Sequence, residues 1–226
     1  MVNMGNDAKV SCFLHLIYIN AAKIVNYKNF SVFLLIRNPF NWSKTMADDR
    51  HIINLCHEGE YEIAFNSIVD TYSERLYWHV RRFLCSHEDT NDLLQDIFIK
   101  IWGSLPSFRG DAQIYTWLYR IATNETLNYL KKIRRENAIS LDAVGQMLAT
   151  RIDEDPYFNG DALQRELHKA IQQLPEKQRL VFNMRYFDEL KYEDIAEITG
   201  TSVGALKASY HHAYNKIKEA LENADI

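Results

Sequence analysis

The stretch Lys191-Tyr-Glu-Asp-Ile-Ala-Glu-Ile-Thr-Gly200-Thr-Ser-Val-Gly-Ala-Leu-Lys-Ala-Ser-Tyr-His-His-Ala-Tyr-Asn-Lys-Ile-Lys218 predicts a helix, a tight turn and a second helix. Gly200 stands where a left-handed C-terminal cap is usual, and Ser202 can cap the helix that follows. Ala196 is small enough to let the two helices cross closely. This is the pattern of a helix-turn-helix, whose second helix enters the DNA major groove.

The second helix of this motif has one apolar face and one polar, basic face. The apolar residues recur at spacings of three or four and are predicted to point inward: Leu206, Tyr210, Ala213 and Ile217. The residues left to face outward are Lys207, Ser209, His211, His212, Lys216 and Lys218. A solvated surface helix is the alternative interpretation. The absence of Asp and Glu from residue 202 to residue 218 favours DNA, because solvated faces usually mix both signs of charge.

The segment Gly200-Thr-Ser202-Val-Gly204 also matches the G-x-S-x-G motif of serine hydrolases. That motif needs a strand before the serine, whereas residues 192–199 predict a helix. The three cysteines, Cys12, Cys56 and Cys85, have no paired spacing, so no zinc site or disulfide framework is implied and a reducing cytoplasm is expected. The sequence therefore predicts no enzyme, no cofactor and no metal site. The net charge of −4 means that nucleic-acid binding must rest on local basic patches.

Two helices upstream carry polar stripes. One is predicted to begin at a capping signal near Ser86 and to present Asp92, Gln95, Asp96 and Lys100, which taken alone are most simply a solvated face. Pro106 and Gly110 mark the loop after it. A further helix, beginning near Ala112 or Gln113, places five residues on one stripe: Arg120, Asn124, Asn128, Lys131 and Arg135. Asn and Arg suit base edges, and Lys and Arg suit phosphates, although an ordinary surface stripe is the alternative.

The chain is predicted to be all-α, with two small helical domains at 46–136 and 162–224. It has only eight Gly and four Pro among 226 residues, and few alternating β patterns. Residues 137–161 are predicted to be a flexible acidic linker, with five acidic residues against Arg151, and with Gly145, Pro156 and Gly160 interrupting any helix. Residues 1–45 are an N-terminal extension outside the fold. They are interpreted as an upstream start before Met46, or else as a membrane-associating or regulatory arm.

Several motifs, in this order, together resemble an extracytoplasmic-function (ECF) sigma factor of the sigma-70 family. They are Asp92-Leu-Leu-Gln-Asp-Ile-Phe-Ile-Lys-Ile-Trp102, Phe108-Arg-Gly-Asp, Thr116-Trp-Leu-Tyr-Arg-Ile-Ala122, Leu174-Pro-Glu-Lys-Gln-Arg179 and Tyr192-Glu-Asp-Ile-Ala-Glu. The resemblance covers about residues 48 to 222. Residues 202–213 are similar to the version common in Bacteroidetes members.

The resemblance implies sigma-2 and sigma-4 domains that bind core RNA polymerase, recognise the −10 and −35 promoter elements and melt the −10 region. The polymerase-binding residues it implies are Asp92, Leu93, Gln95 and Asp96. The −10 set is Phe108, Arg109, Arg120, Asn124, Asn128, Lys131, Arg134 and Arg135. The −35 set is Ser202, Lys207, Ser209, His211 and His212. An anti-sigma factor is a further candidate partner, and a cytoplasmic protein without a small-molecule substrate or stable membrane insertion is expected.

Three residues depart from the family pattern. Lys191 stands where a Ser or Thr cap is usual, and His212 and Tyr214 stand where Arg is frequent. The alternatives are a helix-turn-helix regulator that works without polymerase, and a sigma mimic that sequesters an anti-sigma factor. The helix at 92–102 argues against the first, and the Asn- and Arg-bearing stripe argues against the second. The free chain is expected to be partly closed and to open on polymerase.

Overall fold

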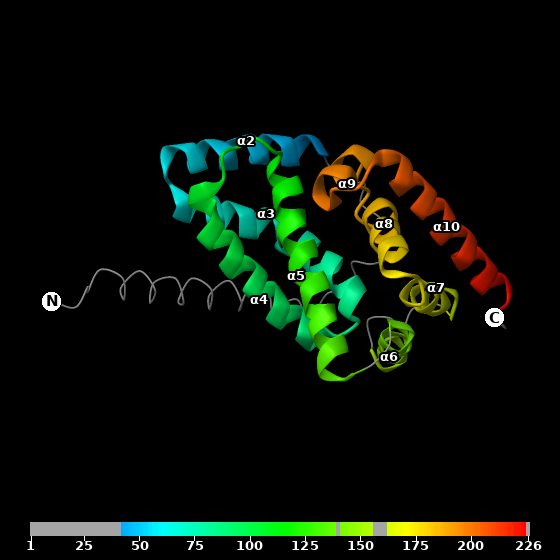
Figure 1. The fold of residues 1–226 in the computed structure, drawn as a ribbon. Helices are drawn as coiled ribbons and strands as arrows, with labels where there is room; N and C mark the ends of the chain where they lie inside the picture. Colours follow the sequence, from blue (N-terminus) through cyan, green and yellow to red (C-terminus); the bar gives the residue numbers. More distant parts are fainter. Residues whose placement is uncertain (1–41, 139–140, 156–161, 225–226) are drawn as a thin grey trace.

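A computed structural model describes residues 42–138, 141–155 and 162–224, and the regular structure in these ranges is helical (Figure 1). Residues 1–41, which make up most of the predicted N-terminal extension, lie outside the described residues. The first described helix, α2 (Trp42–Glu58), begins upstream of Met46. The prediction that the fold starts near residue 46 is therefore displaced by about one turn of helix.

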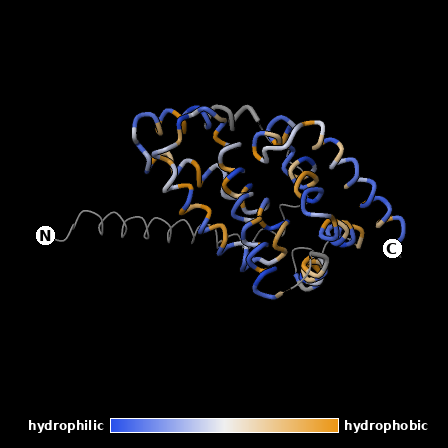
Figure 2. Tube along the Cα trace, in the orientation of Figure 1, coloured by the Kyte–Doolittle hydropathy of each residue, from blue (hydrophilic) through white to orange (hydrophobic). Residues whose placement is uncertain are grey.

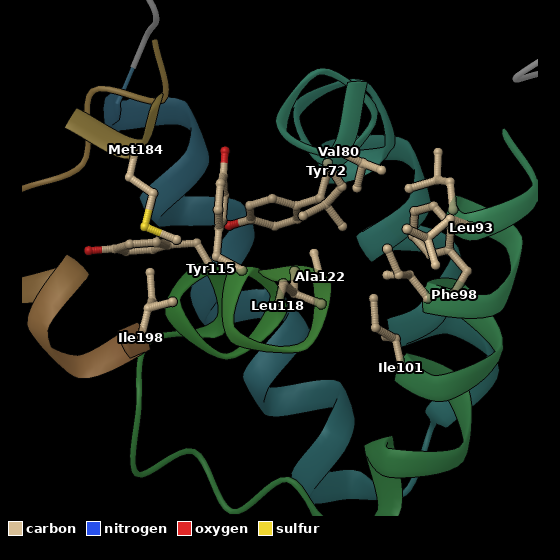
Figure 3. Packing of buried hydrophobic residues seen from close by; sticks show 14 of the residues in the cluster. Tyr72, Val80, Leu93, Phe98, Ile101, Tyr115, Leu118, Ala122, Met184 and Ile198 are labelled. Atoms are coloured by element: carbon tan, nitrogen blue, oxygen red, sulfur yellow. The ribbon is translucent and has the colours of Figure 1, made fainter. Parts of the chain in front are cut away.

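Four helices form the first bundle: α2, α3 (Tyr61–Leu84), α4 (His87–Ser104) and α5 (Ile114–Glu136). Their apolar stripes meet in one core, and side chains of this core are shown in Figure 3. The fully buried members include Ile68, Tyr72, Leu76, Val80, Ile97, Ile101, Leu118 and Ala122. Burial of each large aliphatic side chain stabilises the bundle by about 1.5–3 kcal/mol.

The start of α4 follows the capping signal predicted from the sequence. The Ser86 hydroxyl accepts a hydrogen bond from the Asp89 amide at 3.2 Å. After α4, a short 3-10 turn η2 (Leu105–Ser107) leads into the loop before α5. Gly110 has a φ of +77°, a left-handed conformation that glycine adopts without strain. Helix α5 begins at Ile114, with Gln113 as its N-cap, within two residues of the prediction.

The prediction that Gly145 interrupts helix formation is wrong, because α6 (Leu141–Glu154) continues through it. Val144, Leu148 and Ile152 recur every four residues and are buried against the first bundle. This regular apolar spacing outweighs a single glycine, which costs a helix about 1 kcal/mol. The middle of the predicted linker is therefore an ordered helix. Residues 156–161, with Pro156 and Gly160, lie outside the described residues.

Polar contacts also hold α6 in place. Arg151 Nη1 donates to the Leu84 carbonyl oxygen at 3.0 Å and to the Asp89 carboxylate at 2.6 Å. The Arg81 guanidinium, which is fully buried, pairs with the Asp155 carboxylate. The charged residues of this segment therefore bind the end of α3 and the start of α4, which spacing along the sequence alone could not show.

The second unit consists of α7 (Ala162–Gln172), α8 (Glu176–Tyr186), α9 (Tyr192–Thr199) and α10 (Val203–Glu222). Pro175 lies at the N-cap of α8. Gly200 has a φ of +67° and ends α9 in the left-handed cap expected of it. A small core of this unit is formed by Ala170, Ile171, Leu174, Phe182, Ala213 and Ile217.

The two units are packed against one another, with α8 and α9 beside the first bundle (Figure 1). Buried residues of the second unit, including Met184, Ile195 and Ile198, belong to the same apolar cluster as the core of α3, α4 and α5. Figure 3 shows Met184 and Ile198 beside Tyr115 of α5. This packing agrees with the partly closed chain expected from the sequence.

Gly145→Ala should destabilise the protein by about 1–3 kcal/mol, the usual cost of overpacking. A Cβ at this position would lie 2.8 Å from the Gln172 carbonyl oxygen of α7, so α6 and α7 would have to separate. The matched control is Gly204→Ala in α10, where a Cβ would meet nothing within 4 Å. This control should be neutral or gain up to about 1 kcal/mol from helix propensity. Urea denaturation of both variants checks the prediction, which equal effects would contradict.

Candidate nucleic-acid interface

Helix α10 presents the two faces that the sequence predicts. Leu206, Ala213 and Ile217 are buried, and Tyr210 is half-buried and stacks on Phe182 with ring centroids 5.6 Å apart. The exposed residues of the opposite face are Lys207, His211, His212, Lys216 and Lys218. Figure 2 shows this C-terminal helix as largely hydrophilic. The exposed face is the size and polarity of surface that a major-groove helix needs.

Two of the predicted −35 residues, Ser202 and Ser209, differ from the others in their surroundings. The Ser202 hydroxyl accepts a hydrogen bond from the Ala205 amide at 3.4 Å and thereby caps α10. Ser209 is half-buried. Ser202 is preceded by helix α9 and not by a strand, so the serine-hydrolase interpretation lacks its required geometry. Lys207, His211 and His212 are exposed, as is Ser202.

The first helix of the motif begins without the usual Ser or Thr cap. The Asp194 carboxylate instead accepts a hydrogen bond from the Lys191 amide at 3.3 Å. An acidic residue in the first turn also complements the positive end of the helix dipole. The departure at Lys191 is therefore compensated from within the helix.

The predicted stripe on α5 is a surface feature. Asn124, Asn128, Lys131 and Arg135 are exposed, as is Arg134 at the end of the helix. Arg120 is the exception. Its Nη2 donates to the Glu197 carbonyl oxygen of α9 at 2.9 Å, with the Glu197 carboxylate at 3.4 Å. Five of these six cationic and amide side chains are thus exposed, while the sixth, Arg120, is hydrogen-bonded to the second unit.

Phe108 and Arg109 lie in the loop just before α5, the helix that carries this stripe. Phe108 is half-buried, and its ring lies 4.8 Å from that of Trp117 at an angle of 42°. Trp117 is itself half-buried. Arg109 is exposed. The loop is therefore anchored by an aromatic pair and leaves its guanidinium to solvent.

The polar face of α4 separates cleanly from its apolar face. Asp92, Gln95 and Asp96 are exposed, and Leu93 beside them is only 5% exposed (Figure 3). The assignment of Leu93 to a polymerase contact is therefore corrected: its side chain packs in the core beneath the polar face. The other three residues sit on a rigid helix that this core supports.

A buried ionic cluster, which the sequence did not reveal, joins the two units. The Asp188 carboxylate, in the turn after α8, lies 2.7 Å from His79 Nδ1 and 2.7 Å from Arg82 Nη1, both on α3. His79 Nε2 lies 3.1 Å from the Thr123 hydroxyl of α5. Burial by itself would raise the pKa of Asp188, but His79 and Arg82 outweigh it and hold the pKa below its usual value. The carboxylate is therefore ionised at neutral pH.

Further contacts surround this cluster. Gln172 Nε2 donates to the Arg82 carbonyl oxygen at 2.7 Å, and the Arg82 guanidinium lies 4.6 Å from the centre of the Phe187 ring. His168 of α7 stacks on the same Phe187 ring, with the two ring centroids 5.7 Å apart. On α5, burial and a hydrogen bond to Asp194 raise the pKa of the Tyr115 hydroxyl. Both ends of the interface are thus polar, with apolar packing between them.

These features define an all-helical protein with a helix-turn-helix and a second polar stripe. Comparison with known families is consistent with this description: residues 68–136 match Sigma-70 region 2, and residues 164–217 match Sigma-70, region 4. Within the described residues, no helix is both long and apolar enough to cross a membrane.

Curated relatives cover most of the chain. The RNA polymerase sigma-H factor of Pseudomonas aeruginosa is 30% identical over 187 residues, which is 79% of this chain and 96% of that protein. The ECF RNA polymerase sigma-E factor of Escherichia coli K12 is 33% identical over 183 residues, which is 77% of this chain and 93% of that protein.

Two solved structures share the fold. CnrH in complex with the cytosolic domain of CnrY is 22% identical, with a TM-score of 0.59, covering 77% of this chain and 97% of that one. RpoE in complex with the anti-sigma factor NepR from Bartonella quintana is 24% identical, with a TM-score of 0.52, covering 66% and 91%. The chain belongs to the sigma-70 family of RNA polymerase sigma factors, within its ECF group. It functions in promoter-directed initiation of transcription.

Asp188→Asn should weaken the contact between the two units. The substitution keeps the shape but removes the charge, and it leaves Arg82 and His79 without their anion, a loss of about 3–5 kcal/mol for a buried pair. Small-angle scattering of the free protein should show a larger radius of gyration. The control is Glu189→Gln, an equal charge change at the exposed neighbour. Identical scattering from D188N and the unaltered protein would contradict this role of the cluster.

Stability should fall as the pH is lowered from about 6.5 to about 4. Burial, together with the guanidinium groups of Arg82 and Arg81, lowers the pKa of His168 to about 4. The unfolded chain binds this proton near pH 6.5, so between the two values the unfolded state holds more protons and the free energy of unfolding declines with acidification.

The test is denaturation across this pH range. His168→Phe keeps an aromatic ring against Phe187 and should flatten the pH dependence, whereas His211→Phe on the exposed face of α10 should leave it unchanged. A pH dependence that is the same in H168F as in the unaltered chain would count against His168 as its source.

Proposed function

We propose that Asp92, Gln95 and Asp96 form the contact with core RNA polymerase. They are exposed on one helix whose opposite face is buried, so the side chains are presented without loss of support. The acidic and amide groups suit a partner surface that offers basic and hydrogen-bonding side chains. We assign this face to a sigma-2 domain at residues 46–136.

The −10 element is recognised by the α5 stripe and the loop before it. Asn124 and Asn128 carry both donors and acceptors, which are needed to distinguish bases. Extrusion of a base costs a few kcal/mol of stacking, and a pocket that accepts the extruded base recovers that energy. Phe108 and Arg109 lie in the loop that would form such a pocket. No chemical step is catalysed, since melting requires only differential binding.

Lys131, Arg134 and Arg135 supply the phosphate contacts. Their position at the exposed end of α5 is suited to the DNA backbone, which contributes affinity but little sequence information. The −35 element is read by α10 of a sigma-4 domain at residues 162–224, through Lys207, His211 and His212, with Ser202 and Ser209 as partly engaged members of the set.

Promoter binding requires the two units to separate at least locally. Arg120, one of the −10 residues, is bonded to Glu197 of α9 in the closed form. The interface that must open is polar at both ends, so its groups can be hydrated when it separates. A partner that holds the closed form, such as an anti-sigma factor, would keep the protein inactive in the cytoplasm.

Variants of Asn124, Lys131 and Gln95 separate the three proposed roles. With core polymerase and promoter DNA, Asn124→Ala should lose melting of the −10 region, seen as permanganate reactivity of unpaired thymines, while it retains core binding. Lys131→Gln should lower the log–log salt slope of promoter binding by about one unit. Gln95→Ala should lose core binding.

The salt slope distinguishes base reading from phosphate contact, because Asn124 carries no charge. Its variant should leave the slope unchanged. DNA binding without core polymerase and without melting would support the regulator alternative. Failure to bind either partner would support the sequestering mimic.

A further inference from the structure

A cavity of about 420 Å³ is lined by residues from the end of α5, the start of α6 and the junction of α7 with α8. Its charged lining residues are Lys131 and Arg134 from α5 and Glu176 and Arg179 from α8. Walls from both units and from α6 are needed to form it. Cavities of about this volume are typical of small-molecule sites.

Arg179 is the unusual member of this lining. It is only 5% exposed, and within the described ranges no carboxylate lies at ion-pair distance from it. Its Nη1 donates to the Gln172 side-chain oxygen at 3.0 Å, but its Nε has no hydrogen-bond partner in the part of the chain described. Burial lowers the pKa of this guanidinium. A buried cation in such surroundings is stabilised by an anion.

The start of α8 adds hydrogen-bond donors at the same place. Pro175, which lines the cavity, is the N-cap of this eleven-residue helix, and no side chain caps it. The first amide groups of a helix have no partner within the helix and carry partial positive charge. A phosphate group is the anion that such a terminus commonly binds.

The balance of charge also favours an anion. The cavity is lined by three cations, Lys131, Arg134 and Arg179, and by one acid, Glu176. Lys131 and Arg134 are exposed and can turn toward a ligand. The apolar walls, which could hold an uncharged part of the same molecule, are Leu130, Val144, Leu174 and Pro175.

We propose that this cavity binds the phosphate group of a small phosphorylated molecule of about nucleotide size. Because the cavity has walls from both units, the ligand stabilises the closed form. If the function proposed above holds, it also covers Lys131 and Arg134, so that ligand and promoter DNA compete. The protein would then be inhibited directly by a phosphorylated metabolite, without a protein partner.

The test is titration calorimetry of the full chain with inorganic phosphate, pyrophosphate and adenosine monophosphate, at an ionic strength held constant with chloride. Saturable binding of adenosine monophosphate and no binding of adenosine are expected. Absence of saturable binding by all three phosphate compounds would overturn the proposal.

Variants establish whether a built site is responsible. Arg179→Gln and Arg134→Gln should each weaken binding by about tenfold or more, the usual effect of losing a charge-assisted hydrogen bond. Arg134 is exposed, so R134Q should fold even if R179Q does not. The matched control is Lys132→Gln, an exposed cation that lies 3.9 Å from Glu136 and outside the cavity lining. Equal weakening by K132Q and R134Q would show general attraction to a basic helix end and would overturn the site.

Competition with promoter DNA is measured separately. Weaker promoter binding in the presence of adenosine monophosphate supports the full proposal. Calorimetric binding without any competition would retain the site but contradict the promoter role of Lys131 and Arg134, so failure of the site and failure of the proposed function are distinguishable.

Discussion

The closed arrangement of this protein depends on one buried carboxylate. Asp188 stands in the turn between α8 and α9, where Arg82 of α3 pairs with its charge and His79 of α3 lies within hydrogen-bond distance. An ionised carboxylate is costly to bury without such partners, so the turn cannot stay in this environment unless the first bundle is present. Apolar packing of Met184 and Ile198 beside Tyr115 then follows from where this turn places α8 and α9.

This construction has a consequence for function. An interface that combines ion pairs and hydrogen bonds with apolar packing can open at lower cost than a purely apolar one, because water and a new partner replace its polar contacts. The face of α10 that is proposed to read the −35 element is exposed, whereas Arg120 of the proposed −10 stripe is bonded to Glu197. The closed form therefore restricts one of the two proposed promoter contacts more than the other.

Much of the fold could be predicted from local chemistry. The caps at Ser86 and Gly200 and the buried spacing of Leu206, Ala213 and Ile217 depend on neighbours within one helix or turn, and all are confirmed. The predicted helix break at Gly145 is wrong because one glycine costs a helix only about 1 kcal/mol, which the apolar packing of α6 offsets. A glycine is needed at position 145 for a tertiary reason: the Gln172 carbonyl oxygen of α7 lies too close for any side chain. Leu93 was assigned by its position in a motif, whereas its burial is decided by the neighbouring helices.

The sequence by itself determined most of the helices, their apolar faces, the helix-turn-helix and the family, since each depends on residues close together in the chain. Only the tertiary structure decided which polar residues are free for DNA and which are already bound. It also brought Lys131, Arg134 and Arg179 around one cavity and Asp188 to His79, residues 109 positions apart. The physical reason is that charge pairing and burial depend on distances in space. Helical periodicity does not indicate which helix, distant in the sequence, will pack against a given face.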